Sequence, residues 1–396
     1  MRKSIAVISG TILFAVCAAP PVPGQITVRK QAVTENPTLA MASFRGPAAV
    51  ETRFRKILQA VGWFVLTGDP SKADYRLSCA YEPGLLEVTL QSREAGSVSF
   101  RQRSSAGTDV LLFGAADAII EKVFDNPGPC LSRLAFVVAS RGRKEIFACN
   151  FDGTGAEQVT HNRTISTEPS WMPDGQQLLY TLYRTSRTNV VLADLARDRQ
   201  RRLSSFRGLN AGAAPSPDGQ YAALCLSRDR RVELYVMEIA TGRLRRLTRD
   251  AAVESSPCWS PDGTQICYVS DKSGRPQLYV TAVNGTTSRR AVTGYAECVS
   301  PDWSPVSGRL CFAVRSGGNY AIAVAEPGAS AGESRIVTNA AGDWEAPSWS
   351  PDGRHLVCSR DYAGRRGLYV VDSSFRKIRP LLKPADYSLP DWSPRF

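Results

Sequence analysis

The heptapeptide PCWSPDG at residues 257–263 decides the fold of this 396-residue chain, because close variants of it recur along the sequence. The variants are PSWMPDG (169–175), AAPSPDG (213–219), PDWSPVSG (301–308), PSWSPDG (347–353) and PDWSP (390–394). The last proline of each copy recurs at spacings of 44, 44, 44, 46 and 43 residues: Pro173, Pro217, Pro261, Pro305, Pro351 and Pro394. Six occurrences at a nearly constant period predict a repeat architecture.

Each repeat is predicted to contain four strands, a to d. In the Ser-Pro-Asp-Gly sequence the proline presets φ and the glycine accepts a positive φ, which makes a tight hairpin turn after strand a. An apolar strand such as QICYVSD (265–271) follows. The next strand carries a pair such as Leu278-Tyr279, and the last ends near Leu-Thr, as in RRLT (245–248). Four antiparallel strands with an aromatic residue at a fixed place are typical of a β-propeller blade.

The repeats predict six blades. Five begin near residues 168, 210, 254, 297 and 345, and the sixth combines the terminal PDWSPRF with residues 134–160. Joining these two segments would close the ring by hydrogen bonds and leave no open sheet edge. Five of the seven tryptophans share one repeat position: Trp171, Trp259, Trp303, Trp349 and Trp392. This register indicates packing between blades rather than a ligand cage, and Pro215 at the same position predicts an irregular first strand in its blade.

The preceding residues, 25–130, have an α/β pattern. Residues 48–61 follow Pro47 and place apolar side chains on one helical face, and residues 108–124 form a second predicted helix. The apolar face of the first helix consists of Val50, Phe54, Ile57, Leu58 and Val61. Strand-like runs occupy residues 63–68, 73–81, 85–93 and 97–103. The fold class is therefore α+β: a small N-terminal α/β domain (25–130) followed by a six-bladed β-propeller (131–396) of PD40/WD40-like repeats.

The first 24 residues are predicted to be a secretory signal peptide. A basic head, Arg2 and Lys3, precedes an apolar run at residues 5–16 and then small residues. Cleavage after Ala18 fits the small-residue rule, and Val22-Pro23-Gly24 is a later option. This run is too short to span a bilayer comfortably, so we expect a periplasmic chain with no transmembrane segment in its mature form. Residues 26–30 alternate in polarity and predict a free strand-like arm that could extend a partner's sheet.

The composition narrows the classes of function. The chain has 49 Lys+Arg against 37 Asp+Glu, and only 2 His, which excludes a multi-His metal site. The basic excess lies mainly in the propeller, where Arg197, Arg199, Arg201 and Arg202 cluster on one predicted c–d turn. No aromatic stacking surface accompanies them, so nucleic acid is not an expected partner. A basic periphery that faces anionic lipid or peptidoglycan is the better interpretation.

The nine cysteines beyond the leader leave two interpretations open. They are Cys79, Cys130, Cys149, Cys225, Cys258, Cys267, Cys298, Cys311 and Cys358. Disulfides can form in an exported protein, but several of these cysteines fall at core positions of strands. Small buried hydrophobic side chains are the favoured interpretation.

A partner-binding face is predicted from the connections between blades. Because strands alternate in direction, the d–a connections and b–c turns share one face of the disc, and the a–b and c–d turns share the other. The d–a connections carry Glu168, Glu254, Glu297, Glu345 and, in one blade, Asn210. The b–c turns add Arg184, Arg187, Arg228, Arg230, Arg231, Lys272, Arg275, Arg365 and Arg366. A carboxylate-lined channel mouth would attract a cation or a partner's Lys or Arg; the alternative is that these glutamates only solvate loops.

The order of these features resembles the TolB family of the Tol–Pal envelope system. The resemblance covers the whole mature chain and is carried by DWSPRF (391–396), SFRGLNAGAAPSPDG (205–219) and SDKSGRPQLYV (270–280). It implies a non-enzymatic periplasmic protein, with no cofactor, that maintains outer-membrane integrity and constriction during cell division. Whether a channel cation such as calcium is bound is left open.

The resemblance also implies partners and contact residues. The propeller face would bind the lipoprotein Pal near Asn210, Glu254 and Glu345, and we add Glu168, Glu297 and Arg231 to this predicted face. The N-terminal arm would engage TolA through Ile26, Val28 and Arg29. Leu209 departs from the histidine expected in the family. Peptidoglycan and outer-membrane lipoproteins are further candidate partners.

The main alternative is a propeller from a secreted peptidase-like or ligand-binding protein. Residues 328–332, GASAG, match G-x-S-x-G, but that motif needs a helix after the serine and a downstream histidine. Here the segment is predicted to be a small-residue turn, and His355 is the only later histidine and starts a blade strand. We therefore predict a turn without a catalytic role for Ser330.

Overall fold

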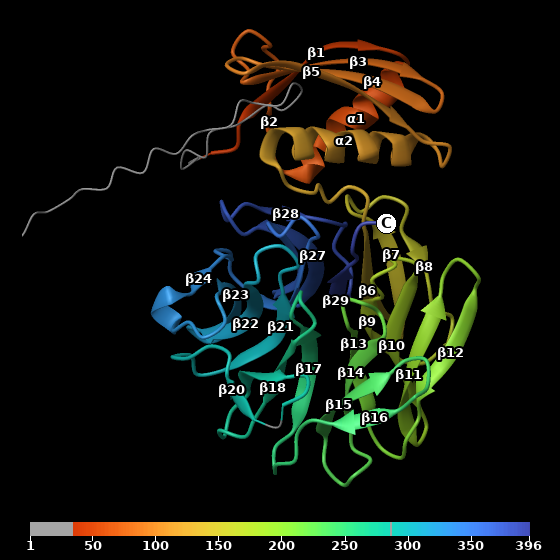
Figure 1. Cartoon of the computed structure of the whole chain (residues 1–396), viewed down its shortest axis with the longest axis vertical. Helices are drawn as coiled ribbons and strands as arrows, with labels where there is room; N and C mark the ends of the chain where they lie inside the picture. Colours follow the sequence, from red (N-terminus) through yellow and green to blue (C-terminus); the bar gives the residue numbers. More distant parts are fainter. Residues whose placement is uncertain (1–34, 286) are drawn as a thin grey trace, which may run out of the picture.

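The repeats form a closed ring of four-stranded antiparallel sheets. The protein is represented by a computed structural model that describes residues 35–285 and 287–396 (Figure 1). Strand a of each blade lies at the centre and strand d at the periphery. The six blades and the α+β fold class are confirmed. The predicted signal peptide and the arm with Ile26, Val28 and Arg29 lie outside the described residues.

Five blades follow chain order from the centre outward. Blade 1 is β9(Ser166–Trp171), β10(Gln177–Arg184), β11(Arg187–Asp194) and β12(Arg199–Ser204). Blade 2 is β13(Asn210–Pro215), β14(Tyr221–Leu226), β15(Glu233–Glu238) and β16(Leu244–Arg246). Blade 3 is β17(Glu254–Trp259), β18(Gln265–Ser270), β19(Gln277–Ala282) and β20(Ser288–Arg290). Blade 4 is β21(Cys298–Trp303), β22(Leu310–Ser316), β23(Asn319–Ala325) and β24(Arg335–Ile336), with the short helix η1(Ala331–Glu333) before β24. Blade 5 is β25(Asp343–Trp349), β26(His355–Tyr362), β27(Arg365–Asp372) and β28(Ile378–Pro380).

Blade 6 joins the two ends of the propeller sequence, as predicted. Its strands are β29(Tyr387–Trp392), β6(Arg133–Ser140), β7(Arg143–Asn150) and β8(Glu157–Gln158). β29 pairs antiparallel with β6 from Tyr387↔Val138 to Trp392↔Leu134. Directly after β29, Oγ of Ser393 accepts the N–H of Arg133, the first residue of β6, at 2.8 Å. The ring is therefore closed by backbone hydrogen bonds between segments about 250 residues apart.

The tryptophans pack between blades, as their register predicted. Trp259 of blade 3, for example, shares a buried cluster with Ala223 and Cys225 of blade 2, and its indole N–H donates to the carbonyl of Ala214 at 2.9 Å. The expectation that Pro215 makes its strand irregular is wrong. β13 has six residues and the same kind of register shift as the other inner strands. Pro215 is its last residue and still pairs with Ala222 of β14, so the proline does not interrupt the strand.

Arginines on the outer strands join neighbouring blades. Five of them lie opposite the same position of strand c: Arg201, Arg245, Arg289, Arg335 and Arg379. Arg201 donates to the carbonyl of Ile239 at 3.3 Å, and Arg335 donates to that of Ser374 at 2.6 Å, in each case across to the next blade. Arg199, Arg201 and Arg202 thus belong to strand β12, which corrects their assignment to a turn. Part of the positive charge contributes to the contacts between blades.

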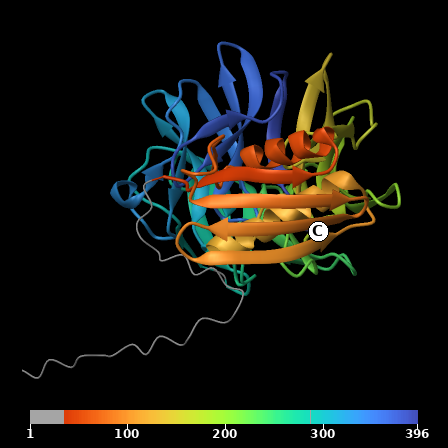
Figure 2. The same ribbon diagram turned by 90° about the horizontal axis from the view of Figure 1, so that it is seen from above.

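The N-terminal unit is a five-stranded sheet with two helices on the face toward the propeller (Figures 1 and 2). Its order is β2-β1-β3-β4-β5. The elements are β1(Thr38–Arg45), α1(Ala48–Val61), β2(Val65–Leu66), β3(Tyr75–Glu82), β4(Leu85–Ser92), β5(Gly96–Arg103) and α2(Thr108–Phe124). Both helices lie where they were predicted, whereas β1 was missed. β1 buries the adjacent Leu39 and Ala40 at one end and is otherwise half-buried or exposed, so its polarity does not alternate clearly.

A buried polar network attaches the N-terminal unit to blade 5. The indole N–H of Trp63 donates to Oδ2 of Asp352 at 3.0 Å, and Nη2 of Arg354 donates to Oδ1 of Asn36 at 2.5 Å. Arg354 also pairs with Asp372 at 2.6 Å. Because every one of these groups is buried, breaking one contact would leave a polar group without a partner, which opposes separation of the two parts.

The cysteines are buried and unpaired. All nine described thiols, from Cys79 to Cys358, are free. Burial raises the pKa of Cys79, Cys149 and Cys298 to about 12, which keeps these thiols protonated and unreactive. Their interpretation as small hydrophobic core residues is confirmed.

Removing residues 387–396 tests the importance of ring closure. Without β29, the inner edge of β6 loses its hydrogen-bond partner and becomes a template for pairing with other chains. We expect loss of the cooperative thermal transition and formation of oligomers, measured by calorimetry and size-exclusion chromatography. Removal of residues 395–396 alone, which leaves β29 intact, is the control and should preserve a monomer. A monomeric long truncation that melts like the full chain would contradict the proposed closure.

Candidate functional site: the channel and its two faces

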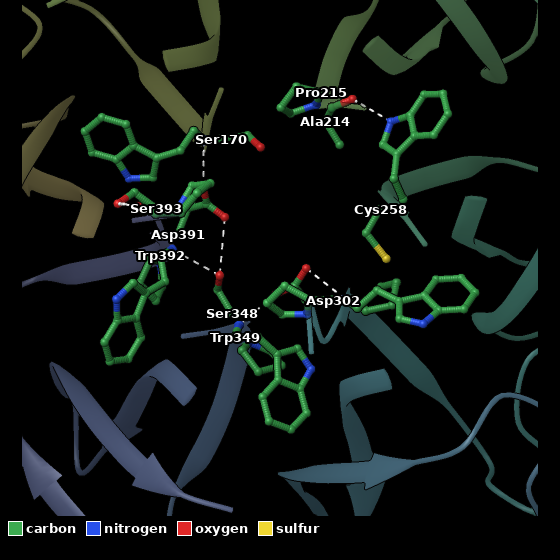
Figure 3. A pocket seen from close by; sticks show the side chains of 18 of the residues that line it. Ser170, Ala214, Pro215, Cys258, Asp302, Ser348, Trp349, Asp391, Trp392 and Ser393 are labelled. Atoms are coloured by element: carbon green, nitrogen blue, oxygen red, sulfur yellow. Dashed lines mark hydrogen bonds between the residues drawn. The ribbon is translucent and has the colours of Figure 1, made fainter. Parts of the chain in front are cut away.

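The inner strands of all six blades line a central cavity of about 650 Å³ (Figure 3). Its wall contains the five repeat tryptophans and the prolines of the a–b turns, including Pro217, Pro261, Pro305, Pro351 and Pro394. These turn prolines place the cavity mouth on the a–b face. The wall is mainly apolar, with a few polar groups from residues next to the tryptophans.

A shared backbone distortion shapes this wall. One residue of every inner strand, three positions before the tryptophan register, has a positive φ between 48° and 62°: Glu168, Gly212, Ser256, Ser300, Ala346 and Leu389. The strand register shifts at the same place in each blade. Each inner strand therefore carries a β-bulge that turns this residue toward the cavity, since all six of them line it.

Two half-buried aspartates latch neighbouring inner strands together (Figure 3). Oδ2 of Asp391 accepts the backbone N–H of Trp171 at 2.7 Å, and Oδ2 of Asp302 accepts that of Trp349 at 2.7 Å. Oγ of Ser348 accepts the N–H of Trp392 at 3.0 Å in the same way. These residues were not among the predicted site residues, although PDW in two copies of the motif, where others have PSW or PCW, is a usable signal.

Desolvation makes both aspartates weaker acids than an exposed aspartate. Desolvation raises the pKa of Asp302 to about 6, and it raises that of Asp391 to about 8, to which the charge of Asp302 also contributes. Backbone N–H donors oppose this effect but do not cancel it. Asp391 is therefore mostly protonated at neutral pH, so the cavity carries less negative charge than its sequence suggests.

The predicted carboxylate-lined channel mouth, an acidic ring of four glutamates, is not present, because the four glutamates occupy four different strand positions. Glu168, Glu345, Glu254 and Glu297 lie three, four, five and six residues before the tryptophan register of their blades. Only Glu168 lines the cavity, where its carboxylate accepts the hydroxyl of Thr181 at 2.7 Å and the N–H of Gly212 in blade 2 at 2.9 Å.

The other predicted face residues differ in accessibility. Glu254 is 1% exposed, accepts the hydroxyl of Ser270 at 3.1 Å, and has its pKa raised to about 7 by burial. Asn210 is also buried, and its Oδ1 accepts the hydroxyl of Ser204 and the N–H of Phe206. Glu297 is half-buried and accepts the hydroxyl of Tyr320, whereas Glu345 and Arg231 are exposed. Asn210 and Glu254 therefore organise the connections, and Glu345 and Arg231 are available to a partner.

The d–a connections and b–c turns share one face, as expected. Backbone hydrogen bonds join them directly, from Thr188 to Gly208 in blade 1 and from Glu254 to Val232 in blade 2. Leu209 is half-buried beside this contact, with its N–H bonded to Oγ of Ser227 at 2.7 Å. The exposed predicted residues are thus presented on the face opposite the a–b turns.

The residues of the peptidase motif are not assembled into a catalytic set. Oγ of Ser330 donates to Oε2 of Glu333 at 2.8 Å and caps the single turn of η1. Nδ1 of His355 lies 2.6 Å from Oδ2 of Asp352, in the junction with the N-terminal unit. Across the described part of the chain, no three His, Cys, Asp or Glu side chains are grouped closely enough to hold a metal ion. In the same residues, no helix is long and apolar enough to cross a membrane.

Comparison with known proteins gives a consistent family. Residues 120–396 match the model of the TolB beta propeller domain. A Tol-Pal system protein TolB from Desulfosudis oleivorans is 38% identical over 81 residues, 20% of this chain and 18% of that protein. One from Xylella fastidiosa is 31% identical over 147 residues, 36% of this chain and 32% of that protein. The matched segments thus span a third or less of these curated relatives' length.

A solved structure extends the similarity to the whole fold. The crystal structure of TolB from Acinetobacter baumannii superposes with a TM-score of 0.81 and covers 91% of this chain and 97% of that chain. The sequence identity is 21%. The N-terminal unit and the propeller therefore share their architecture with that protein.

The pH dependence of the stability of an Asp391→Asn variant tests the contact between Asp391 and the N–H of Trp171. A carboxyl group whose pKa rises from 3.8 to about 8 on folding stabilises the fold at low pH, and this contribution is lost as pH rises through about 8. Asparagine can still accept the N–H of Trp171 but does not ionise. The free energy of unfolding of the variant relative to wild type should therefore increase by at least ~1 kcal/mol from about pH 5 to about pH 9.

The matched control is Asp262→Asn in an a–b turn. Hydrogen bonds from Ser260 and Thr264 lower the pKa of Asp262 from 3.8, so its contribution is present above that value and lost as pH falls. Its effect should change only in acid, with the opposite sign. Denaturant titrations of the wild type and both variants at each pH measure the free energies of unfolding. A difference between Asp391→Asn and wild type that does not change with pH would contradict a raised pKa at Asp391.

Proposed function

Because the chain belongs to the TolB β-propeller family, we propose that it is a non-enzymatic component of a Tol–Pal system that acts by binding other envelope proteins. The match of residues 120–396 to the family carries this proposal. In this proposal the protein works in the periplasm, exported by the leader at residues 1–24, without a cofactor. It helps to maintain outer-membrane integrity and constriction during cell division.

We infer that the propeller binds Pal through the d–a and b–c face. The exposed Glu345 and Arg231 would make charged contacts, while buried Asn210 and Glu254 would hold the loops in shape. Glu168 and Glu297 would support the same face from within, through their bonds to Thr181 and Tyr320. Complementary charges at such a face contribute mainly to association rate and specificity.

We further propose that the N-terminal arm engages TolA through Ile26, Val28 and Arg29. An alternating segment can add to the edge of a partner's sheet by backbone hydrogen bonds. Peptidoglycan and outer-membrane lipoproteins are additional proposed partners, and a calcium-like cation in the channel stays a secondary proposal.

Reversing the two exposed charges tests the Pal face. Glu345→Arg combined with Arg231→Glu keeps the net charge, but it places the wrong sign at each contact. We expect the affinity for purified Pal to fall by about tenfold or more, measured by isothermal titration calorimetry.

The control for this variant is Glu94→Arg with Arg103→Glu, an equivalent exchange of exposed residues on the N-terminal sheet. It should bind Pal as the wild type does. An unchanged Pal affinity in the folded Glu345→Arg, Arg231→Glu variant would exclude these two residues from the interface.

Deletion of residues 25–33 tests the arm. The mature protein without this segment should lose binding to TolA but retain Pal, because the two contacts are on separate parts of the chain. Surface plasmon resonance against each partner measures both. Loss of both interactions in a folded deletion variant would argue against two separate sites.

A further inference from the structure

Blade 1 contains a second cavity, of about 680 Å³, on the d–a and b–c face. The hairpin between β10 and β11 forms one side, and Arg202 of β12 contributes from the outer strand. The connections before and after the blade complete it, with Asn162, Thr164 and Ser205. It is thus peripheral to the central channel and shares none of its lining residues.

The lining of this cavity is strongly basic. Arg184, Arg187 and Arg202 are present, and no carboxylate is among the described lining residues. Arg187 donates to the carbonyl of Ser205 at 3.2 Å. Arg184 and Arg202 are exposed, and their guanidinium groups have no hydrogen bond or ion pair with any described residue. Both are therefore available to an anion, which an arginine fork can bind in a bidentate manner.

One side chain at this cavity is shorter than its equivalents in the next two blades. Arg202, Arg246 and Arg290 lie at the same position of strand d in blades 1, 2 and 3. In blade 2, Arg246 pairs with Glu233 at 2.5 Å; in blade 3, Arg290 donates to Oε1 of Gln277 at 3.1 Å.

Asn189 occupies the corresponding position of strand c in blade 1, where neither an acid nor a long amide fills the space. It is 5% exposed, and its Oδ1 has no hydrogen-bond partner among the described residues. Buried polar atoms of this kind cost free energy unless they are paired. The carboxylate of Glu233 in blade 2 therefore marks where an external acidic group would lie in blade 1, while Asn189 would accept a hydrogen bond from the same ligand.

The remaining lining favours a polyhydroxylated ligand. Thr164, Thr185, Ser186 and Ser205 supply hydroxyl groups, and Tyr183 is the one large apolar surface, with 41% of it exposed. An aromatic ring beside polar groups suits the mixed apolar and hydroxyl surface of a sugar. A peptide partner would instead require an apolar core to its interface, which this cavity does not offer.

We propose that the blade 1 cavity binds an anionic saccharide, a sugar that carries a carboxylate or a phosphate. The acidic group contacts Arg202, Arg184 and Arg187, a ligand hydroxyl donates to Oδ1 of Asn189, and the ring lies against Tyr183. The site does not include the protein-binding face residues Glu345 and Arg231, and for a carboxylate-bearing sugar it rests on the peptidoglycan contact proposed above.

Calorimetric titration of the mature protein with defined sugars tests the site. N-Acetylmuramic acid and N-acetylglucosamine 6-phosphate should bind, and neutral N-acetylglucosamine should bind at least about tenfold more weakly because it lacks the charge. The first two probes distinguish a carboxylate source, such as a cell-wall glycan, from a phosphate source, such as a glycolipid headgroup. Inorganic phosphate and triglutamate complete the set.

Variants connect the binding to the cavity. Arg202→Gln should lower the affinity for the charged sugars by about tenfold or more. Asn189→Glu should abolish binding while preserving the fold, because it reproduces the internal pair of blade 2 and fills the site. Arg275→Gln removes the same charge from the b–c turn of blade 3 and should have no effect.

The outcomes separate the alternatives. Charged sugars that bind wild type and the Glu345→Arg, Arg231→Glu variant equally, but not Asn189→Glu, would support the site even if Pal binding fails. Inorganic phosphate that binds as tightly as the phosphorylated sugar would overturn the saccharide assignment. Tighter binding of triglutamate would overturn it in favour of an acidic peptide. Absence of binding to every probe, or binding unchanged in Arg202→Gln and Asn189→Glu, would overturn the proposal entirely.

Discussion

The antiparallel pairing of β29 with β6 is the constraint on which the propeller depends. Each blade buries apolar side chains against a neighbour, including a tryptophan in five of the six, so no blade is complete alone. In an open array of six blades, the first and last blades would each leave one apolar face uncovered, and the inner edge of β6 would have no partner strand. Closure removes both defects at once, and it brings Trp392 and Asp391 next to Trp171 of blade 1. The central cavity exists only because this contact completes its wall.

Given closure, the differences between copies of the repeat acquire specific structural roles. The residue before the tryptophan is aspartate in blades 4 and 6, and both aspartates reach the backbone N–H of the next blade. At the periphery, arginines at one strand position reach carbonyl groups of the next blade. The inner contacts join blade 6 to blade 1 and blade 4 to blade 5, and the outer contacts join blade 1 to blade 2 and blade 4 to blade 5. The surplus of positive charge is consequently a poor guide to partners, since some of it is used within the ring.

Sequence periodicity was sufficient to predict the blades, their order and the split sixth blade, because turn residues and strand polarity repeat with the fold. It also located α1 and α2 from their apolar faces. It did not locate β1, whose pattern is weak, or the bulge at Glu168 and its equivalents, which depends on pairing with the neighbouring strand. The acidic ring failed for a related reason. Glutamates near one another in the motif can differ by one residue in register, and a shift of one reverses the side of the strand.

Positions that correspond between blades are therefore more informative than residue types taken alone. Glu233, Gln277 and Asn189 have the same place in their blades, and the first two satisfy a guanidinium that belongs to the same sheet. Asn189 is one methylene shorter than Gln277 and leaves both its own oxygen and Arg202 without a partner. In blades 2 and 3 the longer side chain satisfies the guanidinium of Arg246 or Arg290 within the sheet, whereas Asn189 does not reach Arg202. The shorter residue makes physical sense if an external group completes the contact, and the basic hairpin at Arg184 and Arg187 specifies that this group is an anion.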